Sequence, residues 1–265
     1  MLPVLTVSTN GFSMDYITFG EGKRPLVILP GMSVTPVTPD GDAIRAAFAV
    51  LEKTHTVFLF DRKHDVRAGY TVSDMAEDTA AAMRLLGIRD ADIFGTSQGG
   101  MIAQLLAARH HDLVHTVVLA SSADCMDSRA AVVMQRWADL AHAGEPTALN
   151  RDVFRHVYSD GYRETYSDAF RALENIGAKE DLDRFAVLAE ACLSFDSRQE
   201  LEKITCPVFV LGAKDDITLF PERSVALAEQ LCAPLYLYEG YSHAVYDEAP
   251  DFRDRVTKFF ADHNA

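Results

Sequence analysis

The sequence predicts an α/β fold, in which a mostly parallel sheet of eight strands carries helices on both faces. Short runs rich in β-branched and apolar residues alternate with stretches whose apolar residues recur at helical spacing. The length of 265 residues also suits one large domain of this class with an inserted subdomain. The runs expected to form strands are 5–9, 14–19, 25–30, 56–60, 91–95, 115–121, 207–212 and 234–239.

The first two strands differ from the rest. Asn10-Gly11 lies between them and is a typical hairpin turn, so we expect this pair to be antiparallel. From the third strand onward the runs are almost continuously apolar. Such runs are typical of parallel strands that helices cover on both faces.

Helix signals lie between these strands. A Thr71-x-x-Asp74 capping box begins one helix, and Gly87 ends it. Near the end of the chain, apolar residues at helical spacing follow Pro250 and predict a last helix. They are Phe252, Val256, Phe259 and Phe260.

The alternation stops between residues 123 and 203, which contain no convincing strand. We therefore expect a core of residues 1–122 and 204–265, with a helical lid, or cap, of residues 123–203 inserted after the sixth strand. Ligands of such sheets bind beyond the carboxyl ends of the strands, where this insertion begins, so a lid is favoured over extra scaffold. Its helices are expected at about 128–143, 147–158, 161–176 and 180–195.

Composition limits the partners. The net charge of −14 disfavours nucleic acid and anionic membranes. The beginning of the sequence has no basic region, and no apolar run is long enough to span a membrane, so a cytoplasmic location is expected. The four cysteines are widely spaced and form no CxxC pair, which favours four buried thiols over disulfides or a zinc site.

One serine has the setting of a nucleophile. In "DIFGTSQGG", Ser97 follows an apolar strand and precedes a strong helix former. A nucleophile elbow needs this strand–turn–helix context, and it needs small residues such as Gly95 and Gly99 two positions either side of the serine. The free N–H groups of the helix then face the point where an oxyanion would form.

Candidates for the base and the acid follow in chain order. Asp215 and Asp216 come just after the strand 207–212, and His243 comes just after the next strand. The order Ser, Asp, His is the one that the elbow motif predicts. Asp124, after the strand 115–121, is a third possible acid.

An oxyanion hole requires two backbone donors. One belongs to the residue after the nucleophile, which is Gln98, and the other to the loop after the third strand. That loop begins with Pro30-Gly31, so its donor is expected to be the N–H of Met32.

With these motifs in place, the chain resembles the α/β-hydrolases of the lid-bearing esterase and enol-lactonase type. The resemblance covers nearly the full length, through "PGM", "FLFDR", "GTSQGG", "FDSRQELEKITCPVFVLGAKDD" and "YSHAVYDEAP". It implies an α/β-hydrolase fold and an acid three residues after Gly212, which is Asp215. The histidine of the family's Gly-x-x-His stretch corresponds to His243. Pro30-Gly31 replaces the family's usual His-Gly at the start of the oxyanion loop.

The resemblance implies a serine hydrolase that cleaves a carboxylic ester or lactone of a small molecule through an acyl-enzyme, with the triad Ser97, Asp215 and His243. No metal or organic cofactor is expected. The same triad could instead hydrolyse carbon–carbon bonds or act as a cofactor-free peroxidase. A non-catalytic ligand-binding protein and an interaction protein built around the helical insertion are further alternatives, which the complete triad disfavours. The oligomeric state is not predicted.

The walls of the pocket are expected to come from the helical lid. Aromatic residues of the insertion are candidates, although at helical spacing most are expected to be its own core. They are Trp137, Phe154, Tyr158, Tyr162, Tyr166, Phe170 and Phe185. Arg62, Lys63 and His64 could meet an anionic substrate, but a solvated surface turn is the favoured interpretation.

Overall fold

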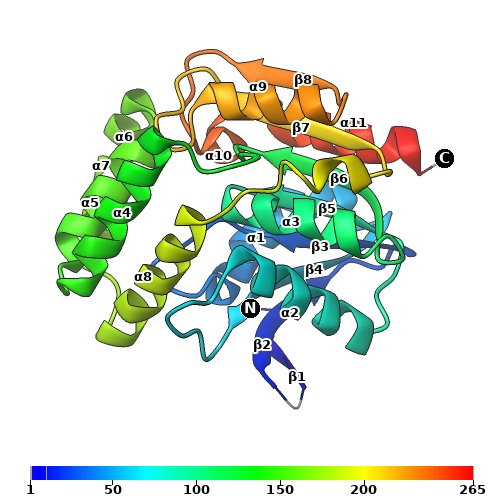
Figure 1. The fold of residues 1–265 in the computed structure, drawn as a ribbon, viewed down its shortest axis with the longest axis horizontal. Helices are drawn as coiled ribbons and strands as arrows, with labels where there is room; N and C mark the ends of the chain where they lie inside the picture. Colours follow the sequence, from blue (N-terminus) through cyan, green and yellow to red (C-terminus); the bar gives the residue numbers. More distant parts are fainter. Residues whose placement is uncertain (1, 10, 265) are drawn as a thin grey trace.

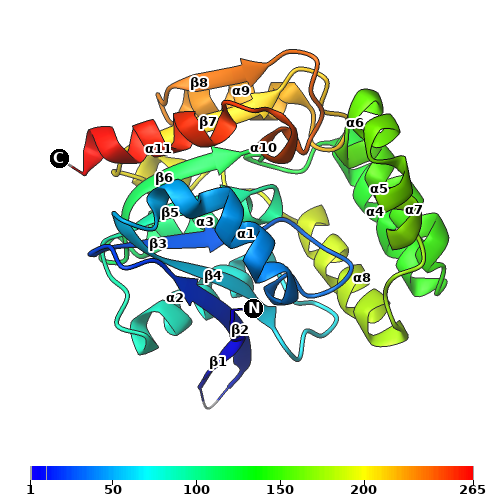
Figure 2. The same cartoon turned by 180° about the vertical axis from the view of Figure 1, so that it is seen from behind.

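The computed structural model describes residues 2–9 and 11–264, which form an eight-stranded sheet with helices on both faces (Figures 1 and 2). The strands are β1 (Leu5–Ser8), β2 (Ser13–Phe19), β3 (Arg24–Leu29), β4 (His55–Lys63), β5 (Ala91–Thr96), β6 (Val114–Ala120), β7 (Val208–Ala213) and β8 (Leu235–Tyr238). The α-helices are α1 (Gly41–Phe48), α2 (Val72–Leu85), α3 (Gln98–Arg109), α4 (Ser128–His142), α5 (Pro146–Val157), α6 (Asp160–Thr165), α7 (Ser167–Leu173), α8 (Lys179–Leu193), α9 (Pro221–Gln230), α10 (Val245–Glu248) and α11 (Phe252–His263). Short 3-10 helices are η1 (Thr38–Asp40), η2 (Ala49–Leu51) and η3 (Leu201–Lys203).

The sheet order is β1-β2-β4-β3-β5-β6-β7-β8. β2 pairs antiparallel with β1 and β4, and the remaining neighbours pair in parallel. The predicted fold class and the antiparallel start are thereby confirmed. Asn10, half of the predicted hairpin turn, lies outside the described residues.

The middle of each parallel strand is mostly apolar because both faces of the sheet are buried. In β3, Val27 and Leu29 join the core cluster that also contains residues of α2 and α3. Their neighbours Leu26 and Ile28 join the opposite cluster, with residues of α1 and α11. Since successive side chains of a strand alternate between faces, two covered faces favour apolar residues at successive positions.

The predicted helix signals are present. Thr71 and Asp74 form the capping box of α2, and Gly87 follows the end of this helix with a φ of 70°. The last helix, α11, begins at Phe252, two residues after Pro250, with Asp251 at its N-cap.

Helices α4–α8 lie between β6 and β7 in the chain and form a separate group at one end of the sheet, toward which the parallel strands point (Figure 2). The helix predicted at 161–176 is divided into α6 and α7 at Tyr166. The segments that enter and leave this group pair through an antiparallel bridge between Cys125 and Asp196. In the part of the chain that the structure describes, no helix has both the length and the apolar character needed to cross a membrane.

Candidate active site

Ser97 lies on a strained turn between β5 and α3. Its φ of 52° and ψ of −120° lie in a region that residues other than glycine rarely adopt. Crowding explains the flanking glycines. A Cβ at Gly95 would lie 2.6 Å from the carbonyl oxygen of Gly99, and one at Gly99 would lie 1.9 Å from that of Leu29. The chain can make this turn only with glycines at these two positions.

The carboxylate that meets His243 is Asp216. Its Oδ2 lies 2.7 Å from Nδ1 of His243, and the two residues are only 4% and 2% exposed. The other oxygen, Oδ1, accepts hydrogen bonds from the backbone N–H groups of Thr218 at 2.7 Å and Leu219 at 3.1 Å. With one oxygen held by the backbone and the other on the ring, this carboxylate can orient the imidazole.

The prediction that Asp215 contacts His243 is wrong. Asp215 is exposed, and its Oδ2 accepts a hydrogen bond from the N–H of Gly240 at 3.0 Å. The error comes from the end of the strand. β7 extends one residue past Gly212, to Ala213, and the residue three positions later is Asp216. In the structure, Asp216 makes a turn of the Asx type with the N–H of Thr218.

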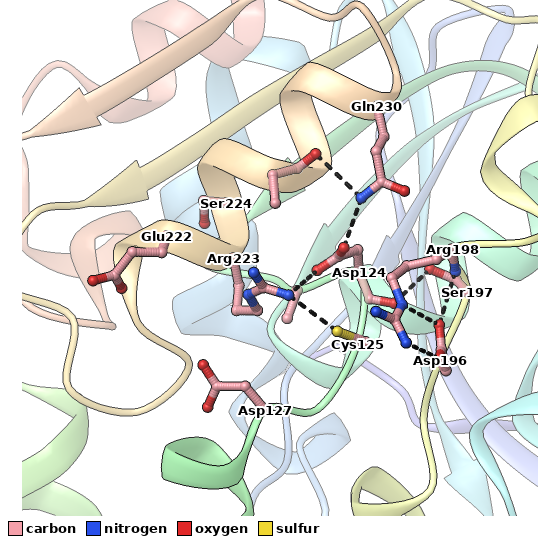
Figure 3. Close-up of polar contacts among 12 residues, drawn as sticks. Asp124, Cys125, Asp127, Asp196, Ser197, Arg198, Glu222, Arg223, Ser224 and Gln230 are labelled. Carbon is pink, nitrogen blue, oxygen red and sulfur yellow. Dashed lines mark hydrogen bonds and ion pairs between the residues drawn. The ribbon is translucent and has the colours of Figure 1, made fainter.

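Asp124, the third candidate acid, is engaged elsewhere (Figure 3). Its carboxylate accepts a hydrogen bond from Nε2 of Gln230 at 2.7 Å and lies 3.4 Å from Nη1 of Arg223. Its carbonyl oxygen accepts from both the N–H and the hydroxyl of Ser197. Asp124 therefore joins α9 to the segment that leaves the helical group, away from the imidazole.

The end of β6 contacts the backbone of both the serine and the histidine. The N–H of Ser97 donates to the carbonyl of Ala120 at 2.9 Å, and the hydroxyl of Ser121 donates to the carbonyl of His243 at 2.6 Å. Ser121 has a φ of 46°, another strained backbone. The consecutive residues Ala120 and Ser121 thus bond to the backbone of Ser97 and of His243. Sequence reasoning missed Ser121, because its role depends on a contact between residues far apart in the chain.

The expected oxyanion loop lies against the serine. A Cβ at Gly31 would lie 3.2 Å from the Cβ of Ser97, and the N–H of Gly31 donates to the hydroxyl of Thr96 at 3.0 Å. Gln98 is the first residue of α3, and the first N–H groups of a helix have no partner within it. Both expected donor segments, the loop with Met32 and the start of α3, therefore lie next to Ser97.

The helical group contacts both loops of the acid and the base. The carbonyl of His156, near the end of α5, accepts from the hydroxyls of Thr218 at 3.0 Å and Ser242 at 3.2 Å. The next carbonyl, of Val157, accepts from the N–H of Ala244 at 2.7 Å. Thr218 and Ser242 stand within two residues of Asp216 and His243, so α5 supports the loops that carry them.

The aromatic residues of the insertion fall into two sets. Trp137 and Phe185 are buried in the main core, at 3% and 1% exposure. The others contact one another on α5, α6, α7 and the residues between them. They are Phe154, Tyr158, Tyr162, Tyr166 and Phe170.

The cysteines only partly match expectation. Cys125 and Cys192 are buried, and burial raises the pKa of the Cys192 thiol to about 11. Cys206 is half-buried and Cys232 is exposed, so the prediction of four buried thiols is wrong for these two. Among residues 2–9 and 11–264, no group of three His, Cys, Asp or Glu side chains is placed to hold a metal ion.

Comparisons with known proteins agree with this fold. A family model described as the alpha/beta hydrolase fold matches residues 25–250. The chain is 25% identical over 233 residues to 3-oxoadipate enol-lactonase 2 of Acinetobacter baylyi, covering 86% of this chain and 83% of that protein. The crystal structure of the enol-lactonase from Burkholderia xenovorans superposes with a TM-score of 0.84 at 25% identity, over 97% of this chain and 100% of that one. An alpha/beta hydrolase from a deep-sea metagenome library superposes with a TM-score of 0.86 at 22% identity, over 97% of both chains.

Proposed function

Because the chain belongs to the alpha/beta hydrolase fold family, we propose that it is a serine hydrolase that cleaves a carboxylic ester or lactone of a small molecule. One observation carries this proposal: the buried pair of His243 and Asp216, 2.7 Å apart, which the end of β6 ties to the strained Ser97. A base held by an acid, beside a serine on an elbow, is the arrangement that makes a hydroxyl nucleophilic.

The proposed reaction is acyl transfer in two steps. Nε2 of His243 takes the proton of the Ser97 hydroxyl as its oxygen attacks the carbonyl carbon, and Asp216 stabilises the resulting imidazolium. The N–H groups of Met32 and Gln98 stabilise the tetrahedral oxyanion. The imidazolium gives its proton to the leaving oxygen, which departs as an alcohol or, from a lactone, stays attached to the acyl group. Water then attacks the acyl-enzyme by the same route and releases the acid.

The relatives support the choice of bond. Two of the similar proteins are named enol-lactonases, and a lactone is an internal ester that the same steps open. The enol-lactonase relatives also support a small molecule as the substrate. The absence of nucleic acid and membrane partners, and the cytoplasmic location, are proposed from the sequence.

We also propose that residues 123–203 act as the lid of this site. The hydrogen bonds from Thr218, Ser242 and Ala244 to the end of α5 support this role. So does the contact of the Gln98 side chain, whose Nε2 donates to the carbonyl of Leu188 in α8 at 2.8 Å. A substrate that reaches Ser97 would therefore lie between the strand ends and this group of helices.

A fluorophosphonate probe tests the serine directly. We expect one covalent adduct, on the peptide that contains Ser97, and none in Ser97→Ala or in heat-unfolded protein, because the hydroxyl is activated only in the folded site. Mass spectrometry of the digested protein locates the adduct. Labelling that persists in Ser97→Ala contradicts the proposal.

A substrate panel tests the bond. Short-chain p-nitrophenyl esters and simple lactones, measured beside a vinylogous diketone, separate ester hydrolysis from carbon–carbon hydrolysis. Hydrolysis of the esters or lactones supports the proposal. Turnover of the diketone alone would favour the carbon–carbon alternative, and a labelled protein that turns over nothing would favour a ligand-binding member of the fold.

A further inference from the structure

Arg62, the eighth residue of β4, is buried. Its exposure is only 5%, and the prediction that it lies in a solvated turn is wrong. Burial lowers the pKa of its guanidinium to about 10, which leaves it charged at neutral pH. Placing a charge inside a protein costs free energy unless hydrogen bonds and opposite charges compensate it, so a buried arginine needs a reason.

Its hydrogen bonds point to that reason. Nη2 of Arg62 donates to the carbonyl of Pro30 at 2.7 Å, and Nε donates to Oε1 of Gln98 at 3.2 Å. Pro30 begins the loop that carries the N–H of Met32. Gln98 is the residue after Ser97. One planar guanidinium therefore bonds to both segments that carry the expected oxyanion donors, and its donors have a fixed geometry.

The surrounding contacts fix this bridge in one orientation. The Gln98 amide donates to the carbonyl of Leu188, which can only accept, so its oxygen must face Arg62. The neighbouring carboxylate of Asp61 supplies the opposite charge. It accepts from the backbone N–H of Arg62 at 2.7 Å and also pairs with Arg184 of α8. Few alternative positions remain for the guanidinium.

We infer that Arg62 is a positioning residue that sets the separation of the two oxyanion donors, the N–H groups of Met32 and Gln98. This inference rests on the proposed function. The oxyanion exists in the transition state and not in the bound substrate, so donors held at the correct separation lower the barrier without tightening substrate binding. Pro30-Gly31 replaces the family's usual His-Gly at this loop, and the bond from Arg62 to the Pro30 carbonyl holds the loop here.

The test compares Arg62→Met, which removes every donor, with Arg62→Lys, which keeps the charge and can reach one of the two acceptors. Removing one oxyanion donor outright costs about 10²–10³ in kcat. Displacing the donors should lower kcat by less than removing one of them. For Arg62→Met we therefore expect kcat to fall by about 10–100-fold, with KM within about two-fold of the wild-type value. Arg62→Lys should recover part of the loss. A trifluoromethyl ketone, whose adduct places an oxyanion in the hole, should lose affinity in step with kcat/KM.

Arg109→Met is the matched control. Arg109 lies at the far end of α3 and is paired with Glu200, so its loss removes a partly buried arginine without touching the oxyanion segments. We expect its kcat and inhibitor affinity to match those of the wild type. The thermal midpoint of each variant is measured, so that a folding defect is recognised as such.

The outcomes separate this inference from the proposed function. Wild-type kcat in folded Arg62→Met overturns the inference, and so does a raised KM at unchanged kcat, which would indicate a substrate contact. The rate of Ser97 phosphonylation in each variant gives a reading that needs no known substrate, since the attacked phosphoryl oxygen also gains negative charge. A wild-type protein that does not label at all overturns the proposed function and, with it, the basis of this inference.

Discussion

At the scale of single residues, two adjacent carboxylates have opposite surroundings. Asp216 is buried, and its carboxylate bonds to the imidazole of His243 and to two backbone N–H groups. Asp215 is exposed, and its carboxylate accepts a hydrogen bond from the N–H of Gly240. A carboxylate can stabilise an imidazolium only if it faces the ring nitrogen that points away from the serine. The local chain path after β7, and not the identity of the side chains, selects Asp216.

Separate substitutions of the three acids test this assignment. Asp216→Asn should lower kcat by about 10³-fold or more, because the amide favours the wrong histidine tautomer, with a smaller effect on KM. Asp215→Asn is the matched control and should stay within a few fold of the wild type. Asp124→Asn should do the same. Steady-state kinetics on one ester decide the assignment, and it fails if Asp215→Asn or Asp124→Asn abolishes turnover while Asp216→Asn remains active.

Another buried carboxylate lies at the end of β5 that is away from Ser97. Asp92 is fully buried and makes hydrogen bonds with His55 at 3.0 Å, Thr116 at 2.5 Å and Asn264 at 2.6 Å. Burial by itself would raise the pKa of Asp92, but these three hydrogen bonds outweigh it and lower the pKa below its usual range. The network joins β4, β5 and β6 to the end of the chain.

Asp92→Asn should lower the free energy of unfolding at pH 7 by about 2–4 kcal/mol, because it leaves buried partners unsatisfied. A lowered pKa in the folded state stabilises the protein above the unfolded value of about 4. That contribution is lost as the pH falls through the folded pKa, so the gap between wild type and variant should narrow below about pH 4. Urea unfolding of both proteins at pH 7 and at pH 3 measures this difference in the free energy of unfolding.

Asp90→Asn is the control for this prediction. Its side chain is 68% exposed and pairs with Arg24 at the surface, so the change should cost less than about 1 kcal/mol. Since Asp92 lies at the end of β5 away from Ser97, kcat per folded molecule should be unchanged. A gap between wild type and Asp92→Asn that stays constant from pH 7 to pH 3 would rule out this account.

At the scale of elements, the helices of the insertion are anchored unequally. α8 buries seven residues, among them Phe185 and Leu188, and packs along α4. Among the described residues, α6 and α7 bury none. Aromatic contacts join them to α5 and to the residue after it, such as those of Phe154 with Phe170 at 4.9 Å and of Tyr158 with Tyr162 at 5.3 Å. Each such pair contributes only about 0.5–1.5 kcal/mol beyond its buried area.

Amide hydrogen exchange should resolve this difference. Peptides that cover residues 160–173 should exchange at least about ten-fold faster than peptides that cover residues 179–193, because local opening there exposes little apolar surface. The N–H of Ala244, bonded to the end of α5, should be protected with the slower set. Mass spectrometry after timed labelling gives the rates. Equal protection of the two segments would show that the insertion opens as one unit.

At the scale of the whole molecule, the insertion and the sheet share one core. The cluster that contains Ile102 of α3 and Leu119 of β6 continues into Trp137 of α4 and Phe185 of α8. Apolar surface buried between two parts of a chain couples their unfolding. The core and the insertion should therefore unfold together.

Calorimetry tests this coupling. The wild type should show a single transition, and Phe185→Ala should shift all of it, at a cost of about 3–5 kcal/mol for a large buried ring. Val132→Ala is the control: Val132 lies in α4 and is 69% exposed, so its loss should change stability by less than about 0.5 kcal/mol. Two separate transitions, with only one moved by Phe185→Ala, would mean that the insertion is an independent domain.

The sequence by itself determined the fold class and the eight strands, because apolar runs, capping residues and turns are local signals that can be recognised in short stretches of sequence. It also singled out Ser97 and His243 as candidate site residues, since an elbow motif and a histidine after a strand are each defined by a few consecutive residues. Only the tertiary structure decided which acid meets the histidine, because one further residue in β7 changes which side chain faces the ring. It also decided that Arg62 is buried, since the Pro30 carbonyl and the Gln98 amide reach it from distant parts of the chain. Contacts of this kind leave no periodic pattern in a single sequence.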